Sequence, residues 1–172
     1  MPVNVEIKAR SSQIKTVRRL LENQVARFVG VDHQIDTYFK VAHGRLKLRQ
    51  GNIENALIHY SRSDQAGPKK SEVLLYQSPT TANLKEVLEA ALDKLVVVDK
   101  SREIYFIDNV KFHLDKVEGL GTFVEIEAID QDGSIGEEKL QEQCNYYLQL
   151  FQIPSSDLVP YSYSDLLLGK EK

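Results

Sequence analysis

Val3-Asn-Val-Glu-Ile-Lys-Ala-Arg10, near the start of the chain, alternates strictly between apolar and polar side chains. Because successive side chains of a β-strand point to opposite faces, this stretch predicts a strand with two different faces. One face is apolar, and the other carries Asn4, Glu6, Lys8 and Arg10, with charges of both signs. Such a strand buries its apolar face and turns its charged face toward solvent or a polar cavity.

The same alternation recurs in later segments, including Arg45-Leu-Lys-Leu-Arg49, which places three cations on one face. The pattern predicts strands at Val3–Arg10, Gln34–Val41, Arg45–Gln50, Ala56–Arg62, Glu72–Gln77, Val96–Ile107, Val110–Val117 and Thr122–Ile129. About eight strands with few parallel crossovers form a mostly antiparallel sheet, which can close around one small ligand. We therefore predict an α+β fold, a closed eight-stranded antiparallel β-barrel with helices packed outside.

Apolar residues at helical spacing predict the helices that cover the barrel. The predicted helices run from Ile14 to near Phe28, from about Ala82 to Leu95, and from about Ile135 to Phe151, with a short one around Ser164–Leu168. Within the second of them, the residues expected to be buried are Leu84, Val87, Leu88, Ala91 and Leu92. Ser63–Lys70 contains Gly67 and Pro68 and is expected to be a loop.

Length and composition exclude several classes of protein. At 172 residues, the chain is expected to form one domain over residues 1–172. Its 22 basic and 25 acidic residues give a net charge of −3, which argues against binding nucleic acid or a membrane surface through overall charge. The single cysteine, Cys144, fits a reducing compartment, and no stretch is apolar enough to span a membrane. A cytoplasmic location is the default expectation.

The polar faces of the predicted strands share a strong enrichment in charge. They carry Glu6, Lys8, Arg10, Lys47, Arg49, Tyr60, Arg62, Lys100, Arg102, Lys111, His113, Asp115, Glu125 and Glu127. Two like charges about 4 Å apart near a protein surface repel by roughly 4 kcal/mol, so clustered cations need counter-charge. The acidic residues supply part of it, and a polyanion held by arginine forks and lysine charges would supply the rest.

Carboxylates beside an anion site indicate a divalent cation, because bare carboxylates would repel phosphate. Glu6, Glu125 and Glu127, with Asp115 nearby, are the candidate ligands for Mg²⁺ or Mn²⁺, which would bridge to phosphate oxygens. Basic residues beside such a metal site are typical of phosphoryl or nucleotidyl transfer, in which positioning and charge stabilisation dominate catalysis.

Each charged pair taken alone is more typical of a solvated strand than of a functional site. His113 is interpreted as a hydrogen-bonded structural residue, and Lys69 and Lys70 are placed in a loop that could fold over a ligand. Asp36 could either orient a basic neighbour or lie at the rim. The functional interpretation is favoured because charges recur at period two across six predicted strands.

An ordered set of short motifs resembles the CYTH superfamily, also called triphosphate tunnel metalloenzymes. Asn4-Val-Glu-Ile-Lys8 resembles its opening Glu-x-Glu-x-Lys signature, with asparagine in place of the first glutamate. The resemblance continues through Leu46–Arg49, Tyr60–Lys69, Lys100–Arg102 and Phe112–Glu127. The segment Tyr161–Leu167 is similar to the branch that contains class IV adenylyl cyclases.

The resemblance implies a tunnel that binds a triphosphate together with Mg²⁺ or Mn²⁺. Matching positions would grip the phosphates through Lys8, Arg10, Lys47, Arg49, Arg62, Lys69, Lys100 and Arg102. Glu6, Glu125 and Glu127, with Asp115, would bind the metal. Lys8 and Arg62 are the predicted catalytic residues. Asn4 brings no charge, which leaves open whether one metal ion binds or two.

The predicted function is metal-dependent hydrolysis of tripolyphosphate, thiamine triphosphate or a nucleoside triphosphate. The first alternative is a class IV adenylyl cyclase, which converts ATP to cyclic AMP and pyrophosphate. The second alternative is a non-catalytic protein that binds polyphosphate or a phosphorylated ligand. The expected partner is a small triphosphate. No interface signature favours a homodimer over a monomer, so the oligomeric state stays open.

Overall fold

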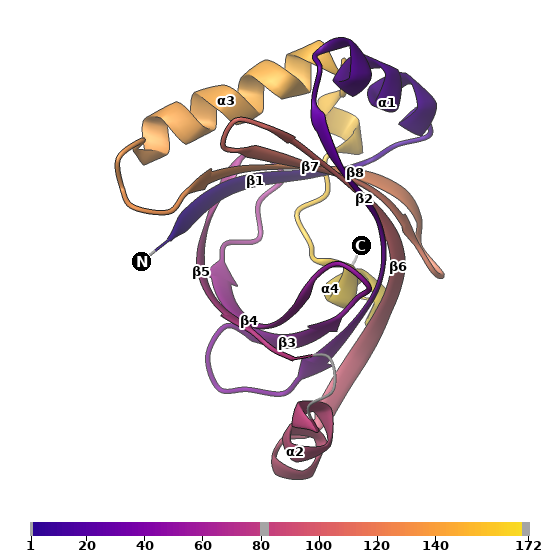
Figure 1. The fold of residues 1–172 in the computed structure, drawn as a ribbon, viewed down its shortest axis with the longest axis vertical. Helices are drawn as coiled ribbons and strands as arrows, with labels where there is room; N and C mark the ends of the chain where they lie inside the picture. The colour runs from indigo at the N-terminus through magenta and orange to yellow at the C-terminus, as the bar shows by residue number, and fades with distance from the viewer. Residues whose placement is uncertain (1, 80–82, 170–172) are drawn as a thin grey trace.

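A computed structural model of the chain, in which residues 2–79 and 83–169 are described, contains a closed ring of eight antiparallel strands (Figure 1). The strands are β1 Val3–Arg10, β2 Arg27–Phe39, β3 Arg45–Gln50, β4 Asn55–Arg62, β5 Lys69–Gln77, β6 Lys94–Ile107, β7 Val110–Val117 and β8 Gly121–Asp130. Their order around the barrel is β1-β5-β4-β3-β2-β6-β7-β8. The predicted fold class is therefore confirmed.

Period-two alternation in β1 separates the outside of the barrel from its inside. Val5 and Ile7 point outward and are 0% and 1% exposed, because they pack under the helices. Helix α1 spans Ile14–Asn23 and helix α3 spans Glu137–Leu150. Both helices cover the outer side of the ring where β1, β7 and β8 lie (Figure 1). This packing forms the main apolar core and leaves the polar faces of the strands directed inward.

The C-terminal segment forms a second buried cluster with the strands. After α3, a short 3-10 helix at Ser155–Asp157 leads to α4, Tyr163–Leu167, which lies within the outline of the ring in Figure 1. Ser162 and Asp165 form a capping box that starts α4, a reciprocal arrangement that satisfies two otherwise unpaired backbone N–H groups. The side chain of Arg45 donates to Asp165 Oδ2 at 2.5 Å and ties α4 to β3.

The first helix is shorter than the sequence predicts, and the following strand is longer. Helix α1 ends at Asn23 rather than near Phe28, and β2 begins at Arg27 rather than at Gln34. Val25, whose spacing suggested a buried helical position, has a φ of 55° and is 88% exposed. A left-handed residue reverses the chain there, so the apolar pattern that continues past Asn23 belongs to the turn and to β2.

Two further expectations about secondary structure are wrong. Strand β5 begins at Lys69, so Lys69 and Lys70 lie in a paired strand and not in a loop. Helix α2 spans Leu84–Ala91 and has no buried residue, and Val87 is 53% exposed. In Figure 1 the helix lies outside the ring, at the bottom of the view. The predicted apolar stripe is therefore not buried against the barrel. The expected start of this helix at Ala82 lies outside the described residues.

The helices were also assessed as possible membrane spans. Among residues 2–79 and 83–169, no helix has the length and apolar character that crossing a membrane requires.

Candidate active site

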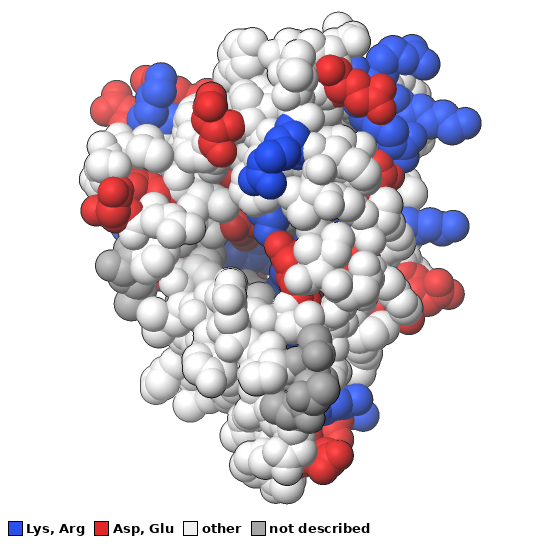
Figure 2. All heavy atoms as spheres, in the orientation of Figure 1, with Lys and Arg blue, Asp and Glu red and all other residues white. Residues whose placement is uncertain are grey.

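The interior of the ring contains a cavity of about 560 Å³ whose wall includes side chains from all eight strands. Figure 2 shows a hollow on this face of the molecule, with basic and acidic side chains inside it. Among the predicted site residues, those that line the cavity are Glu6, Lys8, Lys47, Arg49, Arg62, Lys100, Arg102, Glu125 and Glu127. The alternation of each strand therefore brings residues far apart in sequence to one wall.

Three predicted site residues, Arg10, Lys69 and Asp115, do not line the cavity. Lys69 is 1% exposed, and its Nζ donates to the backbone oxygens of Pro160 and Gln65 at 2.9 and 3.3 Å. Arg10 lies over the ring of Phe123, with 5.2 Å between its Cζ and the ring centroid. Asp115 is 1% exposed and lies beside the cavity-lining Arg102.

Asp115 accepts three hydrogen bonds that fix the orientation of its neighbours. Arg102 donates to it through Nε at 2.8 Å and Nη2 at 2.7 Å, and the hydroxyl of Tyr163 donates at 2.7 Å. The same Nη2 of Arg102 reaches Glu125 Oε1 at 2.6 Å. Because a guanidinium fork held on two sides has little rotational freedom, Arg102 projects into the cavity in one orientation.

Asp36 on β2 is a buried counter-charge for the cations of β3 and β6. Its carboxylate accepts from Arg49 Nε and Nη2, both at 2.9 Å, and from Lys100 Nζ at 2.7 Å, while Lys47 Nζ lies 3.5 Å away. Burial opposes its ionisation, but these cations hold the pKa of Asp36 well below its usual range. Of the two roles the sequence leaves open for Asp36, the structure supports orientation of basic neighbours.

Three carboxylates lie on the wall formed by β1 and β8. Strand register places Glu6 opposite Glu127 and Lys8 opposite Glu125. Glu6 accepts from Arg62 Nη1, and Glu127 Oε1 accepts from Asn4 Nδ2 at 2.7 Å. Asn4, the departure from the family signature, thus donates to a carboxylate, whereas a glutamate at this position would add another negative charge beside Glu127.

The carboxylates of β8 have opposite pKa shifts because their neighbours differ. Burial raises the pKa of Glu127, and the negative charges of Glu6 and Glu125 raise it further. Burial also acts on Glu125, but Lys8 and Arg102 outweigh it and hold its pKa well below the usual value. A cation placed between Glu6 and Glu127 would relieve the repulsion that raises the pKa of Glu127.

Two cavity lysines lose part of their charge at neutral pH. Burial lowers the pKa of Lys8 to about 7, although Glu125 partly opposes the shift. Burial also lowers the pKa of Lys100 to about 7, and the positive charges of Arg49, Arg102 and Lys47 lower it further. The negative charge of Asp36 partly opposes this shift. A polyanion in the cavity would favour the protonated form of both lysines.

We expect the ligand-free protein to become more stable as pH rises from 7 to about 9. The unfolded chain keeps Lys100 protonated up to its ordinary pKa of 10.5, whereas the folded protein releases that proton above about 7. Unfolding therefore takes up protons in this window, which adds up to about 1.4 kcal/mol per pH unit for each such lysine. Urea unfolding at several pH values measures the slope. Lys100→Met should flatten it, and a stability that falls between pH 7 and 9 would contradict the assignment.

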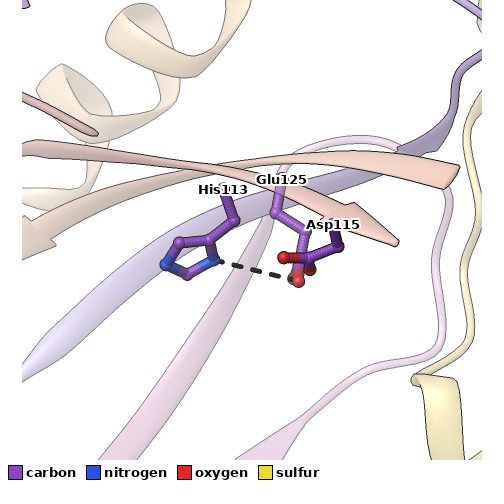
Figure 3. A group of neighbouring side chains, drawn as sticks. All are labelled: His113, Asp115 and Glu125. Carbon is purple, nitrogen blue, oxygen red and sulfur yellow. Dashed lines mark ion pairs between the residues drawn. The ribbon is translucent and has the colours of Figure 1, made fainter. Parts of the chain in front are cut away.

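His113 is the clearest departure from the interpretation made from sequence. Its side chain is 3% exposed, and its two ring nitrogens have no hydrogen-bond partner among the described residues. Its Nδ1 lies 3.9 Å from Glu125 Oε1, too far for a hydrogen bond (Figure 3). Burial and the nearby charge of Arg102 hold the pKa of His113 well below its usual value, so the ring is neutral.

Sequence reasoning also missed Glu54 and Tyr163 as members of the site. Glu54 lies in the turn between β3 and β4, lines the cavity, and accepts from Lys111 Nζ at 2.5 Å and Arg49 Nη1 at 3.2 Å. Its position is fixed by Asp32, whose Oδ2 accepts from the backbone N–H of Glu54 at 3.0 Å. A turn has no period-two pattern from which the direction of a side chain can be predicted. The position of Glu54 between two strands with cationic faces was the available sequence signal that it could join the site.

A scan against protein families matches residues 3–160 to the CYTH domain. The chain belongs to the CYTH family. The resemblance seen in the sequence motifs is thus confirmed, and it covers both the barrel and the strands that supply the charged wall. A search of curated proteins found no match to the chain.

Solved structures share this CYTH fold along almost the whole chain. The PH1012 protein of Pyrococcus horikoshii OT3 is 24% identical with a TM-score of 0.80, covering 95% of this chain and 98% of its own. A candidate adenylate cyclase from Vibrio parahaemolyticus is 17% identical with a TM-score of 0.75, covering 96% and 97%. A candidate adenylyl cyclase from Hippeastrum with a dominant triphosphatase activity is 15% identical with a TM-score of 0.63, covering 99% and 95%. At these identities the likeness shows the fold.

The residues of this CYTH protein fit a divalent cation. Glu6, Glu125 and Glu127 bring carboxylate oxygens to the cavity, and the buried nitrogens of His113 have no partner among the described residues. Ligand atoms of His113, Asp115 and Glu125 all lie within 4.8 Å of one another. Oxygen and imidazole donors in this combination suit a divalent cation.

Proposed function

We propose that this CYTH protein is a divalent-metal-dependent enzyme that hydrolyses a triphosphate. The observation that carries the proposal is the convergence of Lys8, Lys47, Arg49, Arg62, Lys100, Arg102 and Lys111 on one cavity that four glutamates also line. Isolated surface cations would not need buried counter-charges such as Asp36 to hold them in place. A chain of phosphate groups matches the positive charge of these donors.

In the proposed reaction, water attacks the terminal phosphorus and the bond from that phosphorus to its bridging oxygen breaks. Orthophosphate is released, and the bridging oxygen keeps the electron pair on the remaining diphosphate. Arg62 and Arg102 would stabilise charge on the phosphate oxygens, because Glu6 and Asp115 hold their guanidinium groups in place. Lys8, protonated once a polyanion is bound, would donate to the phosphate oxygens, and the orthophosphate product keeps the protons of the attacking water.

The residues proposed to hold Mg²⁺ or Mn²⁺ are Glu6, Glu125 and Glu127, with Asp115 nearby. When bound, such a cation would neutralise phosphate charge. Asn4 would keep Glu127 in position through its 2.7 Å hydrogen bond. The raised pKa of Glu127, caused by burial and by Glu6 and Glu125, is the property expected of a carboxylate awaiting a cation.

An apolar wall of the cavity favours a second candidate, the conversion of ATP to cyclic AMP and pyrophosphate. This wall, defined by Ile58, Val73 and Leu75, lies on β4 and β5, where Ile58 pairs with Leu75. Strand register places Ile58 also beside Lys47 on β3. An organic group attached to a triphosphate could therefore contact the apolar wall while the phosphates contact the cations. Inorganic tripolyphosphate would leave this wall unused.

One assay separates these functions. Purified protein with Mg²⁺ or Mn²⁺ is given ATP, thiamine triphosphate and tripolyphosphate in separate reactions. Orthophosphate release supports hydrolysis, whereas cyclic AMP with pyrophosphate supports the cyclase. Tight binding without turnover of any of the three would overturn both and support a non-catalytic polyphosphate-binding protein.

Glu127→Gln should lower the affinity for the activating metal by about tenfold or more, since it removes one negative donor while keeping the side-chain volume. Glu118→Gln is the matched control, because Glu118 is exposed at the turn after β7. Calorimetric titration with Mn²⁺ measures the affinity, and the metal concentration at half-maximal turnover provides a second readout. Unchanged metal dependence in Glu127→Gln would contradict its assignment as a ligand.

A further inference from the structure

His113 occupies a position that costs folding energy unless something binds it. Its side chain is 3% exposed, it lines the cavity, and both of its ring nitrogens are unpaired within the described residues. Leaving a buried polar atom without a hydrogen-bond partner destabilises the folded protein. Apolar side chains fill equivalent positions in barrels at no such cost. The buried, unpaired imidazole therefore indicates a partner that enters from the cavity.

The neighbours of His113 identify what kind of partner fits. Strand register pairs His113 with Glu125 on β8 and with Ile104 on β6. The imidazole and the carboxylate of Glu125 extend from the same face of the sheet, with Asp115 beside them (Figure 3). An imidazole nitrogen next to a carboxylate oxygen offers two electron-pair donors to one cation.

The spacing of these donors suits a single metal ion. His113 Nδ1 and Glu125 Oε1 are 3.9 Å apart. Two ligands of one ion with bonds of about 2.1 Å lie at most roughly 4.2 Å apart. The observed separation is within this limit. Asp115 is less available, because Arg102 and Tyr163 donate three hydrogen bonds to its oxygens, whereas Arg102 donates one to Glu125, at Oε1.

We propose that His113 is a nitrogen ligand of the divalent cation held by Glu125, and that it makes the site prefer Mn²⁺ to Mg²⁺. This inference rests on the metal site of the proposed function but not on the reaction catalysed there. Mg²⁺ favours oxygen ligands and dehydrates reluctantly, whereas imidazole is a better ligand for later divalent metals. A histidine among the metal ligands would thus raise the affinity for Mn²⁺ relative to that for Mg²⁺.

Pulsed electron paramagnetic resonance of the protein loaded with Mn²⁺ alone tests the inference directly. A coordinated imidazole imposes a ¹⁴N modulation on the Mn²⁺ spin echo, and labelling with ¹⁵N-histidine shifts its frequencies. We expect this modulation in the parent protein and its loss in His113→Gln. We also expect His113→Gln to lower Mn²⁺ affinity by about tenfold, with a much smaller change for Mg²⁺.

A control variant avoids any change inside the barrel. The chain has four histidines, so replacing His33, His43 and His59 together by glutamine leaves His113 as the only one. This triple variant should keep the nitrogen modulation, which makes the test independent of whether His113→Gln folds. Bound Mn²⁺ without nitrogen modulation in the triple variant, or modulation that persists in folded His113→Gln, would overturn the inference.

The outcomes also separate this inference from the proposed function. Nitrogen modulation in a protein that turns over no triphosphate would support the ligand role of His113 and reject the hydrolase. Metal-dependent hydrolysis without nitrogen modulation would support the hydrolase and reject the ligand role of His113.

Discussion

Asp36→Asn is expected to destabilise the protein by about 3 to 5 kcal/mol, the usual result of removing one partner from a buried ion pair. Asp36 is 1% exposed and accepts hydrogen bonds from Arg49 and Lys100, with Lys47 Nζ 3.5 Å away. Asparagine keeps the shape but leaves these cations facing one another without a counter-charge. Urea unfolding followed by circular dichroism measures the loss.

A bound anion should reverse part of that loss, because it supplies the negative charge that asparagine lacks. Saturating tripolyphosphate is expected to raise the melting temperature of Asp36→Asn more than that of the parent protein. The matched control is Asp99→Asn, whose carboxylate pairs with His33 on the exposed surface and should change stability by less than about 1 kcal/mol. A loss below 1 kcal/mol in Asp36→Asn would show that the cations do not depend on Asp36.

Much of the fold was predictable because the cavity inside this barrel is polar, whereas the outer side that the helices cover is apolar. In β1, Val5 and Ile7 contact the helices while Glu6 and Lys8 line the cavity. An alternating strand can satisfy both environments in only one orientation, since a shift of one residue would exchange the faces. The charged positions of the site follow from this constraint, which explains why cations predicted on separate strands converge.

Features without periodicity were not predictable in the same way. Glu54 reaches the cavity from a turn, held by backbone hydrogen bonds to Asp32 that have no sequence period. Helix α2 has a clear apolar stripe, but amphipathicity indicates only that a face favours contact, not which surface covers it. The nitrogens of His113 are unpaired because no side chain that could hydrogen-bond to them lies close enough among the described residues. The sequence pattern does not show which side chains will be neighbours in the fold.

The position of Asn4 connects the sequence signature to the electrostatics of the site. A glutamate at this position would bring a further negative charge to the wall on which Glu6, Glu125 and Glu127 already lie. Asparagine instead donates a hydrogen bond to Glu127 and lowers the charge that a cation must offset. Asparagine at this position is therefore compatible with a cation site whose wall carries less negative charge. Its hydrogen bond also orients Glu127, one of the carboxylates proposed to bind the cation.

Lys8→Ala is expected to reduce triphosphate turnover by about 10² to 10³-fold, the range observed when one preorganised donor to the developing charge is removed. Lys8 is 4% exposed, and its Nζ lies 4.0 Å from the centroid of the Tyr163 ring and 3.2 Å from the Tyr161 backbone oxygen. These contacts hold the ammonium at the cavity wall beside Glu125, the register partner of Lys8 on β8. Steady-state kinetics with tripolyphosphate measures the effect.

The fold should survive this change, because burial lowers the pKa of Lys8 to about 7 and the ammonium is costly to bury without a ligand. Loss of turnover with an unchanged melting temperature would therefore assign Lys8 to the substrate and not to the core. Lys116→Ala, on the exposed outer face of β7, is the matched control and should retain parent turnover. Turnover of Lys8→Ala within about threefold of the parent would be far below the expected range and would exclude Lys8 from catalysis.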